Sequence, residues 1–191
     1  MNHPAPPSRR PATYADVLAA PPHMVAELID GALHVQPRPA SPHAFAAIAL
    51  SDEISGPFRK GRGGPGGWWI LGEPEVHFGE QILVPDLAGW RRDRMPVFPR
   101  EAFFTVAPDW ACEILSPSTR RLDLGRKREV YAEHGVSHLW MVDPDARTLE
   151  VFTRTPDGWL LVATLDGDAP VAQPPFDAVT FPLGALWPPE G

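Results

Sequence analysis

The chain has 191 residues, of which 43% are hydrophobic and 21% are charged. This length and composition predict one folded domain with a substantial core, and they exclude a chain that is disordered throughout. The formal net charge of -7 excludes a protein that coats nucleic acid through a general excess of Lys and Arg. Any contact with nucleic acid must therefore be local.

The sequence contains a single cysteine, Cys112, and so cannot form an internal disulfide. The sequence does not show the cationic start followed by an apolar segment that is typical of a secretory signal. Apolar runs such as residues 44–50 are shorter than the roughly 20 residues of a membrane-spanning helix. These features predict a soluble protein of the cytoplasm.

The first 12 residues are rich in proline without periodicity, which predicts a flexible N-terminus at residues 1–12 followed by a single domain over residues 13–187. A short helix is expected over residues 13–20. In residues 24–35, two strand-like runs flank Asp30-Gly31, a dipeptide typical of a two-residue hairpin turn. This register places Glu27 opposite His34.

Apolar residues recur at helical spacing over residues 41–58, with Ser41 as the expected N-cap. The elements expected after this helix are strands at residues 68–71, 75–78, 82–90, 110–115, 138–142, 148–153 and 159–165, with a helix at residues 123–134. The helix between the strands at 110–115 and 138–142 predicts a strand-helix-strand unit. The proline-rich remainder is expected to wrap the surface.

Glu113 is the most informative residue, because a carboxylate between Cys112 and Ile114 is costly to bury unless a cation or a donor compensates it. Strand alternation turns Cys112 away from Glu113. The alternative for Glu113 is a structural acid paired with a nearby arginine. Asp86, after Pro85, is a second candidate, although an aspartate after proline is also typical of a turn.

Two acids on neighbouring strands can share a Mg²⁺ ion and leave sites for water and a substrate phosphate. Such chemistry also needs a cation to hold the nucleophile and the phosphate, and Lys127 is the best candidate. A cluster of basic residues surrounds it: Arg120, Arg121, Arg126 and Arg128. This cluster indicates either a local nucleic-acid contact or a solvated helix face.

The sequence resembles the Uma-two family from Met24 to Phe152. The residues that carry the resemblance are Glu27 to Gly31, His43, Val84-Pro85-Asp86, Glu113 to Ser118, Lys127, Tyr131, Gly135-Val136 and Trp140 to Pro144. The resemblance implies an endonuclease with an α/β (α+β), restriction-endonuclease-like PD-(D/E)XK fold, in which a mixed central β-sheet is flanked by helices and carries N-terminal and C-terminal β-hairpins.

The resemblance further implies that Asp86 and Glu113 bind the metal and that Glu27 is an additional acid near the site. His43 would orient Glu27 or a phosphate, or would simply be a packed helical residue. The superfamily lysine normally stands two residues after the second acid, where this chain has Leu115. Lys127 must then reach the site from the helix.

Our hypothesis from the sequence is an Mg²⁺- or Mn²⁺-dependent endonuclease that hydrolyses DNA phosphodiester bonds and acts as a homodimer. The first alternative is a catalytically silent protein with the nuclease fold that binds nucleic acid or a protein partner. The second is a scaffolding protein that associates through aromatic surfaces, because the chain has seven tryptophans.

Overall fold

The structure is a computed structural model that describes residues 10–37 and 40–189. Most of the N-terminus predicted to be flexible, residues 1–9, lies outside the described residues. The helical elements are α1 (Tyr14–Leu18), α2 (Ser41–Ile54), the π-helical turn η1 (Ser55–Arg59), α3 (Arg120–Leu122), the π-helical turn η2 (Asp123–Lys127), α4 (Arg128–Glu133) and the 3₁₀ turn η3 (Leu183–Leu186).

The main sheet has six strands in the order β10-β9-β8-β7-β6-β3. They are β3 (Trp68–Gly72), β6 (Leu87–Arg91), β7 (Trp110–Ile114), β8 (His138–Asp143), β9 (Thr148–Thr155) and β10 (Gly158–Asp166). β7 and β8 are parallel, and the other neighbours are antiparallel. The sheet is therefore mixed, and helical elements connect its parallel pair, as the sequence predicts.

A smaller sheet has the order β2-β1-β5-β4. Its strands are β1 (Met24–Ile29), β2 (Ala32–Pro37), β4 (Val76–Phe78) and β5 (Gln81–Leu83). Glu27 pairs with His34 across the β1–β2 hairpin, which confirms the register predicted from Asp30-Gly31. Asp30 and Gly31 have positive φ angles of 51° and 72°, as a two-residue hairpin turn requires.

The expected strand at residues 82–90 is wrong, because the chain forms two strands there that belong to different sheets. β5 ends at Leu83 and β6 begins at Leu87. Pro85 has no N–H group to continue a strand ladder. The side chain of Asp86 instead accepts a hydrogen bond from the main-chain N–H of Ile114. This crossing point brings the acid beside the end of β7.

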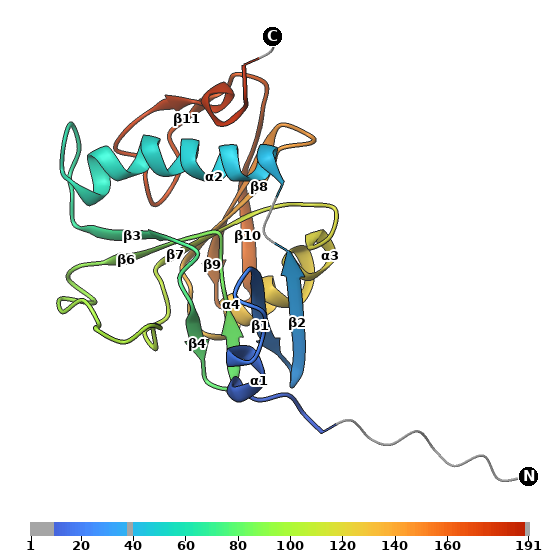
Figure 1. Ribbon diagram of the computed structural model, residues 1–191. Helices are drawn as coiled ribbons and strands as arrows, with labels where there is room; N and C mark the ends of the chain where they lie inside the picture. The colour runs from blue at the N-terminus through green and yellow to red at the C-terminus, as the bar shows by residue number, and fades with distance from the viewer. Residues whose placement is uncertain (1–9, 38–39, 190–191) are drawn as a thin grey trace, which may run out of the picture.

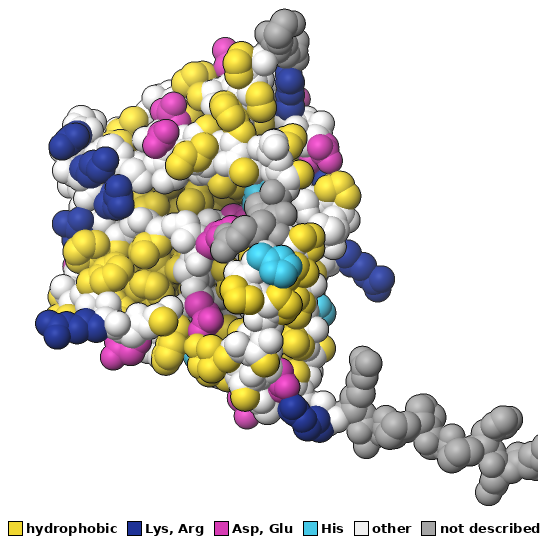
Figure 2. Space-filling view, viewed as in Figure 1, with side chains coloured by type: hydrophobic (Ala, Val, Ile, Leu, Met, Phe, Trp, Pro, Cys, Tyr) yellow, Lys and Arg dark blue, Asp and Glu magenta, His cyan; other side chains and the backbone are white. Residues whose placement is uncertain are grey.

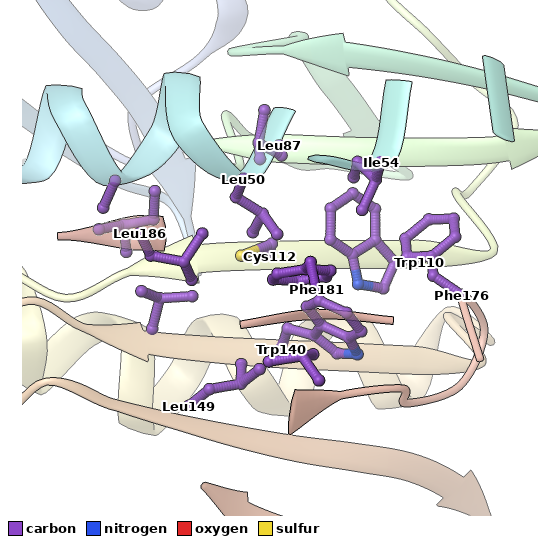
Figure 3. Close-up of a cluster of buried hydrophobic side chains, with 14 of the residues drawn as sticks. Leu50, Ile54, Leu87, Trp110, Cys112, Trp140, Leu149, Phe176, Phe181 and Leu186 are labelled. Carbon is purple, nitrogen blue, oxygen red and sulfur yellow. The ribbon is translucent and has the colours of Figure 1, made fainter. Parts of the chain in front are cut away.

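Helix α2 covers one face of the main sheet, and the C-terminal segment packs on the same side of the molecule (Figure 1). The expectation that the proline-rich C-terminus only wraps the surface is wrong. The short strands β11 (Pro170–Val171) and β12 (Phe181–Pro182) pair with each other. Figure 3 shows Phe176 and Phe181 near Trp110 and Trp140, and Leu186 farther along the same cluster. These apolar side chains complete the core on this face.

The opposite face of the main sheet packs against α4. Val130 and Tyr131 from α4 join a second core with Ala111 of β7. Cys112 belongs to the first core, so the alternation predicted along this strand is confirmed. Glu113 consequently lies on the α4 side, beneath the helical elements that follow β7.

Two helices differ in detail from the prediction. Ala40, not Ser41, is the N-cap of α2, and Ile48 in that helix is 59% exposed. The helix expected over residues 123–134 is interrupted at Gly125, whose φ and ψ of -103° and -109° are not helical. Gly135 follows α4 with a φ of 82°, in agreement with its predicted place after the helix.

The tryptophans do not form an aromatic surface. Among the described residues, the buried ones are Trp68, Trp90, Trp110, Trp140 and Trp187. The content of seven tryptophans therefore reflects the core, and the premise of the scaffolding alternative is wrong.

Within residues 10–37 and 40–189, no helix combines the length and the apolar character that crossing a membrane requires.

Candidate functional site

Glu113 lies at the centre of a buried polar cluster. Its position on interior strand β7 leaves the residue only 1% exposed. Oε1 of Glu113 accepts a hydrogen bond from the hydroxyl of Tyr131. The same oxygen lies 2.9 Å from Nζ of Lys127. Both partners come from the helical elements between β7 and β8, so the strand-helix-strand unit itself supplies the compensation that the buried carboxylate needs.

Lys127 is held by carboxylates from three elements. Its side chain is 2% exposed, and Nζ lies 3.0 Å from Oε1 of Glu27 and 3.3 Å from Oδ1 of Asp123. Together with the contact to Glu113, these distances place the ammonium inside a shell of acids. A buried ammonium is stable only when such partners replace its water.

Glu27 lies behind Lys127 rather than at the solvent edge. Its residue is fully buried, and Oε1 accepts a hydrogen bond from the main-chain N–H of Val84 at 2.8 Å. Oε2 is buried and has no hydrogen-bond partner among the described residues. Glu27 therefore links strand β1 to Lys127 and to the chain just before Asp86.

Asp86 and His43 form the other half of the cluster. Oδ2 of Asp86 accepts the hydrogen bond from the Ile114 N–H at 2.7 Å, and Oδ1 lies 3.2 Å from Nε2 of His43. His43 is 8% exposed, and its Nδ1 has no partner among the described residues. The observed contact is thus to Asp86, and not to Glu27, which was one of the alternatives that the sequence left open for His43.

A pocket of about 360 Å³ opens onto this cluster, and we call it the site pocket. The charged side chains and histidine that line it are His43, Glu73, Asp86, Glu113, Asp123 and Lys127. Figure 2 shows acidic and histidine side chains close together in the middle of one face, whereas the Lys and Arg side chains visible there lie toward the rim. Among the described lining residues, acids therefore predominate, and Lys127 lies at the base of the pocket.

Burial sets the protonation of the cluster. It raises the pKa of Glu113 well above the ordinary range, against the opposing effect of Lys127. It also raises the pKa of Asp123. Burial alone would lower the pKa of Lys127, but Glu113 and Glu27 outweigh it and hold that pKa well above its usual value. Lys127 consequently remains an ammonium and serves as a cation, not as a base.

The pKa of His43 follows the same balance. Burial lowers it, but the hydrogen bond and the charge of Asp86 outweigh the burial and raise the pKa of His43 above its ordinary value. The contact therefore favours the imidazolium beside Asp86.

The donor set fits a small divalent cation. No group of three or more His, Cys, Asp or Glu side chains within the described residues is arranged to hold a metal ion. Mg²⁺, however, commonly uses one or two carboxylates and completes its shell with water and substrate phosphate. Asp86 and Glu113 line one pocket, and the acids there outnumber the single ammonium of Lys127. Such an ion requires hard oxygen donors, which these carboxylates supply.

The arginines near Lys127 have different environments. Arg120 pairs with Asp143, and Arg126 pairs with Asp30 and Glu133. The guanidinium of Arg128 stacks over the ring of Phe152 at 4.3 Å. Arg121 is exposed and has no ion pair among the described residues. These four residues therefore do not contribute equally to a surface that could meet nucleic acid.

Sequence reasoning did not assign roles to Asp123 and Tyr131. Both contact the buried cluster, Asp123 through Lys127 and Tyr131 through Glu113. A signal was available, because each residue stands four positions from Lys127 and side chains at that spacing share a helix face. The interruption at Gly125 does not prevent all three from facing the sheet.

Comparisons with known proteins agree with this fold. Residues 12–184 match the family model Uma2, described as "Putative restriction endonuclease". A similar solved structure is that of "a putative nuclease belonging to DUF820" from Anabaena variabilis ATCC 29413. It has a TM-score of 0.75 and 25% sequence identity, over 92% of this chain and 97% of that chain. No curated protein matches this chain.

Proposed function

We propose that this chain, which belongs to the Uma2 family of restriction-endonuclease-like nucleases, hydrolyses phosphodiester bonds of DNA. The reaction takes place at the site pocket with Mg²⁺ or Mn²⁺ as cofactor. The observation that carries the proposal is the position of Lys127. Its buried ammonium lies 2.9 Å from Glu113 in a pocket that Asp86 also lines. A fixed cation beside Glu113, in a pocket that Asp86 also lines, supports phosphoryl chemistry.

Asp86 and Glu113 would hold the metal ion. When bound, a divalent cation supplies Lewis-acid polarisation of the phosphodiester and a more acidic water. Asp86 is positioned for this role by the Ile114 N–H and by His43. Glu113 is positioned by the Tyr131 hydroxyl.

Lys127 would donate a hydrogen bond to a phosphate oxygen or to the attacking water. The raised pKa of Lys127 supports a donor that stays positively charged. This charge would offset the negative charge of the reacting phosphate. Glu27 is then a positioning residue, since it contacts Lys127 and the main chain of Val84 from behind the pocket. Asp123 anchors the same ammonium.

Nicking of supercoiled plasmid tests the proposal. Wild type, Glu113→Gln and the exposed control Glu80→Gln are compared with Mg²⁺, with Mn²⁺ and with EDTA. We expect metal-dependent nicking by wild type and by Glu80→Gln and none by Glu113→Gln. Nicking that persists in Glu113→Gln, or that survives EDTA, would contradict the assignment.

The alternative is a protein that keeps the fold but binds nucleic acid or a partner without cleaving it. One observation favours it: Oε1 of Glu113 already has two partners within the chain, Lys127 and Tyr131. Calorimetry with Mg²⁺ and Mn²⁺ separates the two functions. No binding of either ion at millimolar concentration would support the silent protein.

We also propose that the protein acts as a homodimer through β10. This strand lies at the edge of the main sheet, and Leu160, Leu161 and Val162 on it are 55%, 47% and 41% exposed. Strand β10 contains no Pro or Lys, the residues that commonly protect an edge. Antiparallel pairing with the same strand of a second copy would satisfy the open main-chain groups and cover the apolar side chains.

Light scattering tests this assembly. Leu161→Lys should yield a monomer, whereas Ile48→Lys, which also replaces an exposed apolar residue but on α2, should remain dimeric. A wild-type protein that is monomeric at micromolar concentration would rule the dimer out.

A further inference from the structure

A second pocket, of about 650 Å³, adjoins the site pocket. The two pockets share the lining residues Gln36, Pro37, Ser118 and Thr119. Their charges differ. The second pocket has His34, Arg121 and Arg126 along its wall and no acidic residue among the described residues that line it. We call it the basic pocket.

The β1–β2 hairpin forms a continuous wall for both pockets. Val25 pairs with Gln36, and Glu27 pairs with His34. Side chains of residues paired in this way project on the same face of an antiparallel sheet. Gln36 lines both pockets and His34 lines the basic pocket, so one face of the hairpin leads from the buried acids to the arginines.

Arg121 is the side chain in the basic pocket with an uncommitted charge. Arg126 is neutralised by Asp30 and Glu133 at distances of 2.7 Å each. Arg121 has no ion pair in the described parts of the chain, and it lies on α3 immediately before the helical turn that carries Lys127. A guanidinium presents a fork of donors that matches two phosphate oxygens.

We propose that the basic pocket binds a backbone phosphate of the substrate strand next to the phosphate held in the site pocket, and that Arg121 is the residue that contacts it. The inference rests on the proposed nuclease function and gives the direction in which the strand leaves the site. The strand passes over Ser118 and Thr119, whose residues line both pockets. Arg121 is therefore a substrate-binding residue, distinct from the three neighbouring arginines.

Binding of a fluorescent single-stranded 12-nucleotide DNA, followed by anisotropy in EDTA, tests the contact without cleavage. Arg121→Ala is compared with Arg154→Ala, which removes an exposed arginine from β9, away from both pockets. Arg121→Ala should weaken binding about 5- to 10-fold and reduce the slope of log K against log salt by about 0.7, as expected for one lost phosphate contact. Arg154→Ala should leave both quantities within about twofold of wild type.

Neutral methylphosphonate linkages, placed one at a time along the same DNA, locate the contact. At one position, the neutral linkage should weaken DNA binding by wild type and by Arg154→Ala as strongly as the Arg121→Ala substitution does. The same linkage should cause no further loss in Arg121→Ala. Equal losses for the two arginine variants, or an Arg121→Ala protein that remains sensitive to that linkage, would overturn the proposal.

Failure of this inference differs from failure of the nuclease function. Binding that depends on Arg121 without plasmid nicking would retain the basic pocket and reject the nuclease activity. Plasmid nicking by wild type, together with equal DNA affinities of Arg121→Ala and Arg154→Ala, would retain the nuclease activity and reject the basic pocket. A wild type that binds no DNA in this assay would overturn the assigned phosphate contact.

Discussion

The ammonium of Lys127 lies 2.9 Å from Oε1 of Glu113, so a cation from a helical turn neutralises a carboxylate at the end of a central strand. Glu27 of β1 and Asp123, which lies on the same helical turn as Lys127, contact this ammonium as well. The pair therefore joins the smaller sheet, the main sheet and the helical layer. We expect the removal of either member to change both the stability of the fold and the proposed activity.

Lys127→Met should destabilise the protein by about 3–5 kcal/mol near neutral pH, because it leaves buried carboxylates without their cation. Urea unfolding in EDTA measures the loss. The exposed control Lys60→Met should change the free energy of unfolding by no more than about 0.5 kcal/mol. Equal effects of the two substitutions would show that Lys127 does not compensate the acids.

Asp86→Asn should weaken metal binding and leave the fold intact. The amide oxygen can still accept the Ile114 N–H, but the negative charge that a divalent cation needs is gone. Calorimetry with Mn²⁺ should give an affinity reduced by at least about 10–100-fold, the range found when groups supporting a metal ligand are removed. Asp52→Asn, an exposed acid on α2, should bind as wild type does. Unchanged binding by Asp86→Asn would remove this residue from the metal site.

Glu113→Gln should gain stability relative to wild type as the pH rises. Burial raises the pKa of Glu113 in the folded state above its unfolded value of about 4.3. The stability that the retained proton provides is complete below the unfolded pKa, and it is lost as the pH rises through the folded pKa. Glutamine remains neutral throughout this range.

The measurement is the free energy of unfolding of both proteins in EDTA between pH 4 and pH 9. This interval begins near the usual pKa of a glutamate side chain and extends about four units above it. The variant minus wild-type difference should increase with pH. A difference that stays constant or decreases would mean that Glu113 is ionised in the fold across the whole range.

Tyr131→Phe should lower stability and slow cleavage without abolishing it. The substitution removes the hydroxyl that donates to Glu113, and leaving a buried acceptor without its hydrogen bond costs about 1–3 kcal/mol. Tyr14→Phe is the matched control, because Tyr14 is only partly buried. Urea unfolding and plasmid nicking should both distinguish Tyr131→Phe from the control. Wild-type rates and stability in Tyr131→Phe would show that Glu113 does not depend on this donor.

Much of the fold follows from local sequence patterns. Asp30-Gly31 predicts the β1–β2 turn and its register because few residues adopt positive φ angles without strain. The apolar run around Glu113 predicts an interior strand, and Gly135 predicts the end of α4. The exceptions are segments whose place depends on distant partners, such as the chain around Pro85 and the C-terminal core residue Phe176.

The candidate site divides in the same way. The sequence identifies Glu113 as a buried acid that requires a cation or a donor, since a charge among apolar neighbours is costly to bury unless it is compensated. It also names Lys127 as the best candidate for that cation, but it does not show that Asp123 and Tyr131 complete the cluster. Those contacts required the helical elements to be packed on the sheet.

The sequence alone therefore determined most of the strands, the hairpin turn and the family resemblance, because these depend on residue types at short spacing. Only the tertiary structure decided which acids share Lys127, that Glu27 lies behind it, and that Arg121 has no ion-pair partner in the described parts of the chain. The physical reason is that charges interact over a few ångströms in space. Separation along the chain does not fix that distance until the two sheets and the helices have packed together.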